Sequence, residues 1–261
     1  MDNVTGLGLS GWRWMLLLEG LPAVIGGVVC YLYLPERPET ARWLSADEKQ
    51  WLLDELAKDR SVKPHIKPLG TLRAITEPRV LLLAAIYFVY QAGSLGVGYW
   101  MPQIIHELSG RLTAFEIGLV SMVPYAIATL AMILWSMHSD RTNERQLHSA
   151  LPLILAACAL ACTVLTREPV LSIALISVAL AGLYAFKSPF WALPGLFLTR
   201  STAAVSIAAI NSLGNLGGFV GPYALGLVKG WTGSPAAGLL FLAALLFAAF
   251  VLTYCMRLVQ P

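Results

Sequence analysis

The chain has 261 residues, of which 57% are hydrophobic and 13% are charged, and its formal net charge is +3 at pH 7. Soluble domains carry about 25% charged residues, and one soluble core could not bury so much apolar sequence, so the composition excludes a soluble enzyme. The basic residues form no stripe interleaved with aromatic side chains, which excludes a nucleic-acid partner.

Seven apolar runs are long enough to cross a bilayer, because a spanning helix needs about 20 mostly apolar residues. A segment in lipid must satisfy its own backbone hydrogen bonds, so each run is expected to be a helix. The expected fold is therefore all-α and transmembrane. The seven runs are 12–34, 79–101, 115–137, 149–167, 170–197, 203–228 and 236–257.

The first run is followed by a long polar segment, residues 35–78, and the other six runs are separated by short turns. We therefore expect three parts. Residues 1–34 hold the N-terminus and the first membrane helix, residues 35–78 form a central loop, and residues 79–261 form a six-helix block.

Two capping boxes mark expected helix starts, Ser45 with Glu48 and Thr113 with Glu116. The first predicts a helix over about 46–59 in the central loop. Its apolar side chains lie among charges, so this helix is expected to be amphipathic and to lie at the membrane surface. A second short helix is expected near residues 69–75.

The loops differ in their content of Lys and Arg. Thirteen of these residues fall on the side of the 35–78 loop and four on the other side. Because basic residues concentrate in cytoplasmic loops, we expect the central loop and the C-terminus in the cytoplasm and the N-terminus outside. The membrane is expected to be the inner or plasma membrane.

Two ionisable side chains lie within apolar runs, where such groups are costly and mark function by default. Lys187 in the fifth run can either face a cavity or snorkel to the cytoplasmic interface, and the sequence favours neither. Glu19 in the first run follows Arg13 by six residues, and a pair of the two or a hydrogen-bonded cluster near the outer interface is the favoured interpretation.

The fifth and sixth runs are irregular. Pro189 and Pro194 each remove a helical hydrogen bond and should bend or open the fifth helix. The sixth run carries Asn211 and Asn215, which are costly in lipid unless they pair across helices or face water. Interrupted helices with polar groups at mid-depth are where transporters bind substrates, so we expect Trp191 and Asn211 to line a cavity.

Glycines of the sixth run are spaced for close helix packing. Gly214 with Gly218, and Gly217 with Gly221, are both pairs of small residues four apart. We expect these glycines to serve packing.

The loop after the third run is densely charged, with Asp140, Arg141, Glu144 and Arg145 in six positions. The simplest interpretation is an anchor of basic residues on the cytoplasmic side. The alternative is a charge relay in which Asp140 meets a helix N-terminus and the arginines meet carboxylates, with contacts that break when this side opens.

The remaining reactive side chains predict no cofactor and no metal. The four cysteines lie inside apolar runs, where Cys usually behaves as a small hydrophobe. The four histidines map to loops or span ends and are expected to be dispersed.

Four motifs, in order along the chain, resemble the anion:cation symporters of the major facilitator superfamily, which include tartrate-, phthalate- and hexuronate-type organic anion permeases. The motifs are Gly11-Trp12-Arg13-Trp14 with Glu19-Gly20-Leu21-Pro22 and the Pro35–Leu44 segment, Ser139-Asp140-Arg141-x-x-Glu144-Arg145, Pro189-Phe190-Trp191-Ala192-Leu193-Pro194, and Asn211-Ser212-x-Gly214-Asn215-Leu216-Gly217-Gly218. The usual glycine after Asp-Arg-Thr is Asn143 here, and Asn tolerates left-handed backbone well.

The resemblance implies that the seven runs are helices six to twelve of a twelve-helix transporter, with helices one to five absent. It implies secondary active transport of a small organic anion by proton symport and alternating access. Partners would be the lipid bilayer, the organic anion, the proton and an N-terminal half. The matching positions suggest Trp191 and Asn211 as substrate-binding residues, followed by Gln91, Tyr87 and Ser188.

Two other expectations accompany this interpretation. The depth of Lys187 makes it a further candidate for anion binding, and the charged loop with Asp140, Arg141, Glu144 and Arg145 is the candidate gating loop. The alternatives to transport are a seven-helix receptor or sensor with a partner on the 35–78 loop, or a fragment that does not transport. A membrane enzyme is disfavoured because no span carries a catalytic cluster.

Overall fold

The computed structural model describes residues 8–62, 71–109, 113–166, 168–198 and 200–256. Every element they form is a helix, which confirms the all-α expectation. Seven helical stretches are long and apolar enough to cross a membrane, and they match the seven expected runs to within a few residues. These stretches are Gly11–Tyr33, Pro78–Tyr99, Phe115–Thr142, Gln146–Thr163, Pro169–Phe197, Thr202–Thr232 and Ala236–Cys255.

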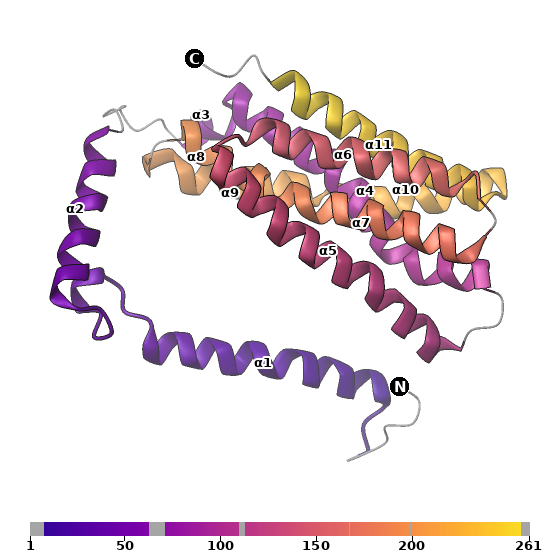
Figure 1. Ribbon diagram of the computed structural model, residues 1–261, viewed down its shortest axis with the longest axis horizontal. Helices are drawn as coiled ribbons and strands as arrows, with labels where there is room; N and C mark the ends of the chain where they lie inside the picture. Colours follow the sequence, from indigo (N-terminus) through magenta and orange to yellow (C-terminus); the bar gives the residue numbers. More distant parts are fainter. Residues whose placement is uncertain (1–7, 63–70, 110–112, 167, 199, 257–261) are drawn as a thin grey trace. The chain divides into compact units, whose positions relative to one another are not determined.

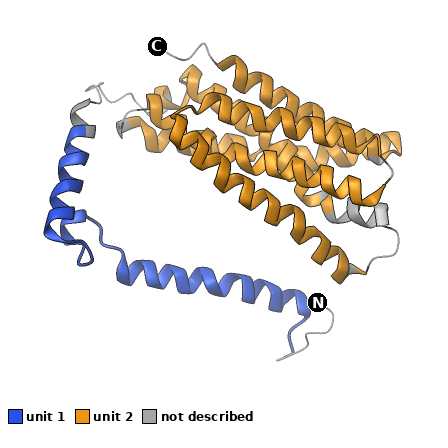
Figure 2. Ribbon diagram, in the orientation of Figure 1, with its two compact units in different colours: residues 1–65 blue, residues 66–261 orange. Residues whose placement is uncertain are grey.

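The chain divides into two compact units, residues 1–65 and residues 66–261 (Figure 2). The first unit contains α1 (Gly11–Tyr33), the 3-10 helix η1 (Pro38–Thr40) and α2 (Ala46–Val62). The second unit contains α3 (Thr71–Ile75), α4 (Pro78–Ser109), α5 (Ala114–Thr142), α6 (Gln146–Thr163), α7 (Pro169–Ala192), α8 (Pro194–Phe197), α9 (Arg200–Asn215), α10 (Gly217–Thr232) and α11 (Pro235–Cys255). The three-part division at residues 34 and 78 stays a prediction.

Both expected capping boxes are present. Ser45 N–H donates to Glu48 Oε2 at 2.9 Å while Glu48 N–H donates to Ser45 Oγ at 3.3 Å, and α2 begins at the next residue. Thr113 and Glu116 make the same reciprocal bonds at the start of α5. Each box satisfies backbone N–H groups that have no partner within the helix.

The expected pairing of Glu19 with Arg13 in α1 is wrong. The Arg13 guanidinium lies 5.3 Å from the centre of the Trp12 ring, and Glu19 is exposed within its unit. Six residues make about one and two-thirds turns of helix, so the two side chains leave the helix in different directions.

The second unit is a bundle in which helices distant in sequence lie side by side (Figure 1). Along the bundle, α5 packs on α7, α7 on α6, α6 on α11, and α11 on α4, which also contacts α9 and α10. The core contains the fully buried rings of Tyr90, Phe186 and Phe190. Thus α4 and α7, which bring these rings together, hold the centre of the unit.

Glycines allow α10 to lie directly against α4. A Cβ atom at Gly217 would meet the carbonyl oxygen of Phe88, and one at Gly221 would meet the carbonyl oxygen of Ala92. Gly214 faces the Tyr87 ring in the same way. The expectation that these glycines serve close packing is confirmed.

Two of the spans are broken, as their sequences suggested. Between α7 and α8, Leu193 N–H donates to Phe190 O, the carbonyl that Pro194 leaves without its usual helical donor. Between α9 and α10, Leu216 N–H donates to Leu213 O at 3.3 Å, so the helix tightens there. The turn after α5 has Asn143 in the left-handed region with φ of 52°, which confirms its suggested role.

Candidate functional site

The first candidate region is an aromatic cluster where α4 meets α7. The Tyr87 and Trp191 rings meet edge to face with centroids 5.1 Å apart, and Tyr87 stacks on Phe190 at 5.5 Å. Behind them, Tyr90 donates a 2.8 Å hydrogen bond from its hydroxyl to Leu183 O, which joins α4 to α7. Aromatic pairs of this geometry contribute about 0.5–1.5 kcal/mol beyond their buried area. The rings of Tyr87, Phe190 and Trp191 therefore form a rigid surface, which we call the aromatic wall.

A ladder of amides stands beside this wall. Gln91 Nε2 donates to Asn215 Oδ1 at 2.7 Å, and Asn215 Nδ2 donates to Asn211 Oδ1 at 2.8 Å. Gln91 is 9% exposed, whereas both asparagines are exposed. The ladder therefore runs from the edge of the core on α4 outward along α9, and its Gln91–Asn215 bond is the pairing across helices under which asparagine is tolerated in a span.

The ladder leaves hydrogen-bonding groups available for a ligand. Asn211 uses its side-chain oxygen within the ladder, so its amide N–H groups are oriented by that bond and can donate to an oxygen atom. Gln91 uses its amide nitrogen in the same way and keeps an acceptor oxygen. Such a surface can recognise a carboxylate or a hydroxyl group while Tyr87 and Trp191 cover an apolar part.

Two of the residues expected at the site, Lys187 and Ser188, take different positions. Lys187 is half-buried, and its Nζ atom lies 4.4 Å from the centre of the Tyr184 ring. Tyr184 in turn meets Tyr125 of α5 edge to face at 6.1 Å. Ser188 is exposed on α7. Lys187 thus belongs to a second aromatic group, shared by α5 and α7.

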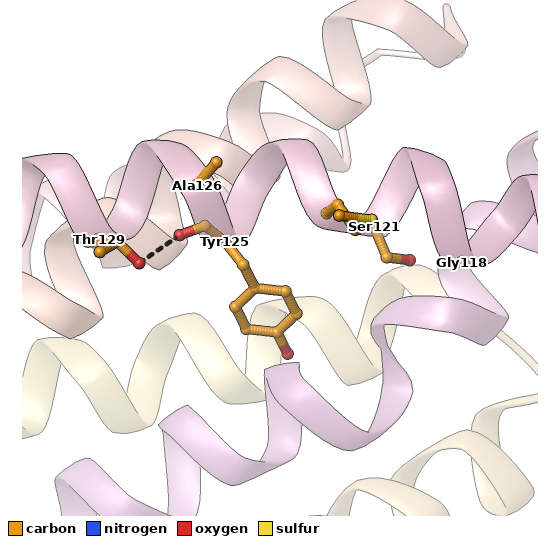
Figure 3. A pocket seen from close by; sticks show the side chains of 6 residues that line it. Gly118, Ser121, Tyr125, Ala126 and Thr129 are labelled. Carbon is orange, nitrogen blue, oxygen red and sulfur yellow. Dashed lines mark hydrogen bonds between the residues drawn. The ribbon is translucent and has the colours of Figure 1, made fainter. Parts of the chain in front are cut away.

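Tyr125 also lines an open hollow of about 480 Å3 along α5 (Figure 3). Its ring points away from its own helix in that view, and its hydroxyl lies 3.8 Å from where a Cβ of Gly98 on α4 would be. The hollow is lined by Gly118, Ser121, Met122, Tyr125, Ala126 and Thr129. It is apolar apart from hydroxyl groups, and it suits a ligand's uncharged portion.

The second candidate region is the charged loop between α5 and α6. Arg145 Nη1 pairs with Asp140 Oδ1 at 2.5 Å and donates to Ser139 Oγ at 3.1 Å. Glu144, not Asp140, meets the helix N-terminus, because its carboxylate accepts hydrogen bonds from the N–H groups of Leu147 and His148. The relay hypothesis placed the wrong acid at the helix, since Asp140 still belongs to the last turn of α5. Arg141 is exposed.

Glu144 is held as a carboxylate. Burial raises its pKa, but the hydrogen bonds from Leu147 and His148 lower it by more, so the pKa lies below its ordinary value. A depressed pKa means that Glu144 stabilises the fold above its unfolded pKa, and that this contribution is lost as the pH falls through the folded value.

The expectation of dispersed histidines is wrong for two of the four. His138 Nδ1 and His148 Nε2 lie 2.7 Å apart, and His148 Nδ1 lies 2.7 Å from Glu144 Oε2. His65 and His106 fall outside the residues whose side chains the structure describes. His138 lies five residues before Asn143, the residue at which the chain reverses, and His148 lies five residues after it. This equal spacing about the turn is the sequence feature that could have predicted their contact.

No group of three metal-binding side chains occurs within the described part of the chain. The amide ladder and the charged loop therefore offer hydrogen bonds and charge, and the residues in hand provide no preformed ligand set for a metal ion.

Comparison with known proteins places these features in context. Residues 4–222 match the model of the Major Facilitator Superfamily. Two proteins of Agrobacterium vitis, each named "Putative tartrate transporter", are 43% and 39% identical over 98% of this chain. A "Quinolone resistance transporter" of Acinetobacter baumannii is 38% identical over 97% of it. The matched segments cover 58%, 56% and 58% of these relatives, so the chain spans little more than half their length.

Proposed function

The chain belongs to the Major Facilitator Superfamily, and from this premise we propose that it forms part of a secondary active transporter for a small organic anion. We further propose that transport occurs by alternating access and is coupled to protons. The substrate class rests on the relatives named for tartrate and on the chemistry of the amide ladder. The family and the names of the relatives indicate a transporter and not an enzyme. None of the relatives reported above is named as a receptor.

The single observation that carries the proposal is the amide ladder beside the aromatic wall. Asn215 is held from both sides, by Gln91 and by Asn211, at the end of an interrupted helix. Oriented N–H donors next to an aromatic surface fit a hydroxylated carboxylate better than a purely apolar molecule. Trp191, Tyr87, Gln91 and Asn211 are proposed as binding residues, and Ser188 and Lys187 as more peripheral ones.

Loss of the central amide should weaken substrate binding. Asn215→Leu removes the two hydrogen bonds that orient Gln91 and Asn211, each worth about 0.5–1.5 kcal/mol, so the apparent KM for a transported anion should rise about 5- to 150-fold. The matched control is Gln50→Leu, which removes the exposed Gln50–Asp54 amide bond of α2 and should leave KM unchanged.

The measurement is exchange of radiolabelled tartrate in proteoliposomes. The chain is tested alone and after co-expression with the part of the 43% identical relative that lies outside the matched segment, since the substrate site is proposed to lie between two halves. Equal KM for Asn215→Leu and the parent would remove the ladder from the site. Absence of exchange of every hydroxylated carboxylate, in both arrangements, would refute the transport proposal.

Orientation in the membrane remains a proposal based on loop charge, with α2 and the α5–α6 loop in the cytoplasm. A cysteine at exposed Asp47 should then escape an impermeant maleimide on intact cells, whereas one at exposed Thr232 should react, in a background without the four native cysteines. The reverse labelling pattern would invert the assignment.

A further inference from the structure

Three titratable side chains at the junction of α5 and α6 form a continuous chain of short contacts. The contacts run from Glu144 Oε2 to His148 Nδ1, and from His148 Nε2 to His138 Nδ1, both at 2.7 Å. His148 is buried, and its ring lies 4.9 Å from that of His138. The outer histidine, His138, is exposed.

The ionised carboxylate of Glu144 determines which ring nitrogens of His148 and His138 carry protons. Because Glu144 accepts two backbone N–H bonds and its pKa is lowered, it is a carboxylate, and His148 Nδ1 must carry the proton between them. In neutral His148 the Nε2 atom then has a lone pair. The 2.7 Å contact to His138 requires one proton, so neutral His138 carries it on Nδ1 and presents a bare Nε2 outward.

One additional proton can be accommodated without loss of a hydrogen bond. It adds to His138 Nε2, the Nδ1 proton of His138 passes to His148 Nε2, and His138 Nδ1 is left with a lone pair. His148 is then an imidazolium that donates to the Glu144 carboxylate at one end and to His138 at the other. A second proton could bind only to His138 Nδ1, where two N–H groups would face each other and the bond would break.

The other charged groups nearby are either paired with each other or exposed. On α5 and α6 these are Asp140 and Arg145, which pair with each other, and Arg141, which is exposed. From α7, the residues that line the hollow beside His138 are Ala181, Gly182 and Ala185. From α11, the carbonyls of Thr253 and Tyr254 accept bonds from Gln146. Within the described residues, the carboxylate at this site is Glu144.

We propose that Glu144, His148 and His138 form a single-proton binding site that holds the end of α5 to the start of α6 until a second proton binds. The site is separate from the amide ladder, and it does not depend on the identity of the transported substrate. It makes the contact between α5 and α6 sensitive to the number of protons that the site holds.

The test uses the full chain labelled with 15N-histidine in detergent micelles, with two-bond 15N–1H spectra recorded from pH 8 to pH 5. The first step should change three ring nitrogens together. His138 Nε2 gains a proton, His138 Nδ1 loses one, and His148 Nε2 gains one. Two histidines that titrate in separate steps, or a His138 that keeps its Nδ1 proton throughout that step, would overturn the proposal.

Two variants separate this site from ordinary packing. His138→Gln supplies an acceptor that does not titrate, so the concerted step should be lost and His148 should gain its proton alone. Asp140→Asn removes the neighbouring carboxylate, which pairs with Arg145 and not with a histidine, and the concerted step should persist. Loss of the step in Asp140→Asn, or its survival in His138→Gln, would contradict the assignment.

Release by the second proton has its own readout in Trp135, which donates to His148 O and lies against both imidazole rings. Below the first step, emission that depends on Trp135 should shift as α5 loosens from α6, and Trp135→Phe identifies that part of the signal. The shift should be absent in His138→Gln. A shift of equal size in His138→Gln would show that the second proton does not act through this bond.

Discussion

At the scale of single residues, a proline and a tryptophan share one carbonyl group. Pro152 within α6 has no N–H to donate to the carbonyl of His148, four residues earlier. The indole of Trp135 on α5 donates to that carbonyl at 2.8 Å. A defect in one helix is thus satisfied by its neighbour, which ties the two helices together beside the histidine pair.

This arrangement predicts a double-mutant cycle. Trp135→Phe leaves the His148 carbonyl without its donor and should lower the free energy of unfolding by about 1–3 kcal/mol. In a Pro152→Ala background the new backbone N–H serves that carbonyl, so the same tryptophan change should cost less. Unfolding in detergent measures both, with Trp51→Phe on exposed α2 as the control. Equal costs in the two backgrounds would mean that the hydrogen bond contributes little.

Residue-scale contacts were the least predictable from the sequence. Asn211 and Asn215 are four apart and share a helix face, but their partner Gln91 lies 124 residues from Asn215 and no local pattern joins them. The histidine pair depends on a reversal at Asn143, whose left-handed backbone was suggested by the residue type alone. Glu144 was taken for part of a relay, and its role as a helix cap became clear only from its bonds to Leu147 and His148.

At the scale of elements, the hydropathy pattern predicted all seven membrane-length helices. All seven apolar runs are helices, because lipid leaves the backbone no alternative, and both capping boxes lie where α2 and α5 begin. The break before Pro194 follows from its missing N–H. The break at Leu216 had no proline to reveal it, and it falls where glycines hold α9 and α10 close to α4.

The contact of α10 with α4 predicts opposite effects of the same change at two glycines of one helix. Gly217→Ala places a Cβ against the Phe88 carbonyl oxygen, so it should cost about 1–3 kcal/mol or more of stability. Gly230→Ala meets nothing within 4 Å, and it should be neutral or gain roughly 0.5–1 kcal/mol from helix propensity. Thermal unfolding in detergent compares the two. Equal melting temperatures would show that α10 can move away from α4 freely.

At the scale of the whole molecule, six stretches of the second unit and one of the first are long and apolar enough to cross a membrane. The family match covers residues 4–222, while the chain spans little more than half of its relatives. Composition predicted a membrane protein, the four motifs predicted a transporter, and loop charge gave a direction of insertion that stays a prediction. They could not identify a substrate, because the Gln91–Asn215–Asn211 ladder joins α4 to α9 and no local sequence pattern connects these helices.

The central claim is proton-driven transport of an organic anion, and accumulation of labelled tartrate against its own gradient tests it most directly. Proteoliposomes containing the chain and an N-terminal half are given equal tartrate on both sides and an inward proton gradient. We expect net uptake that a protonophore abolishes and that Asn215→Leu strongly reduces. Exchange of tartrate without accumulation, insensitive to the proton gradient, would contradict the account.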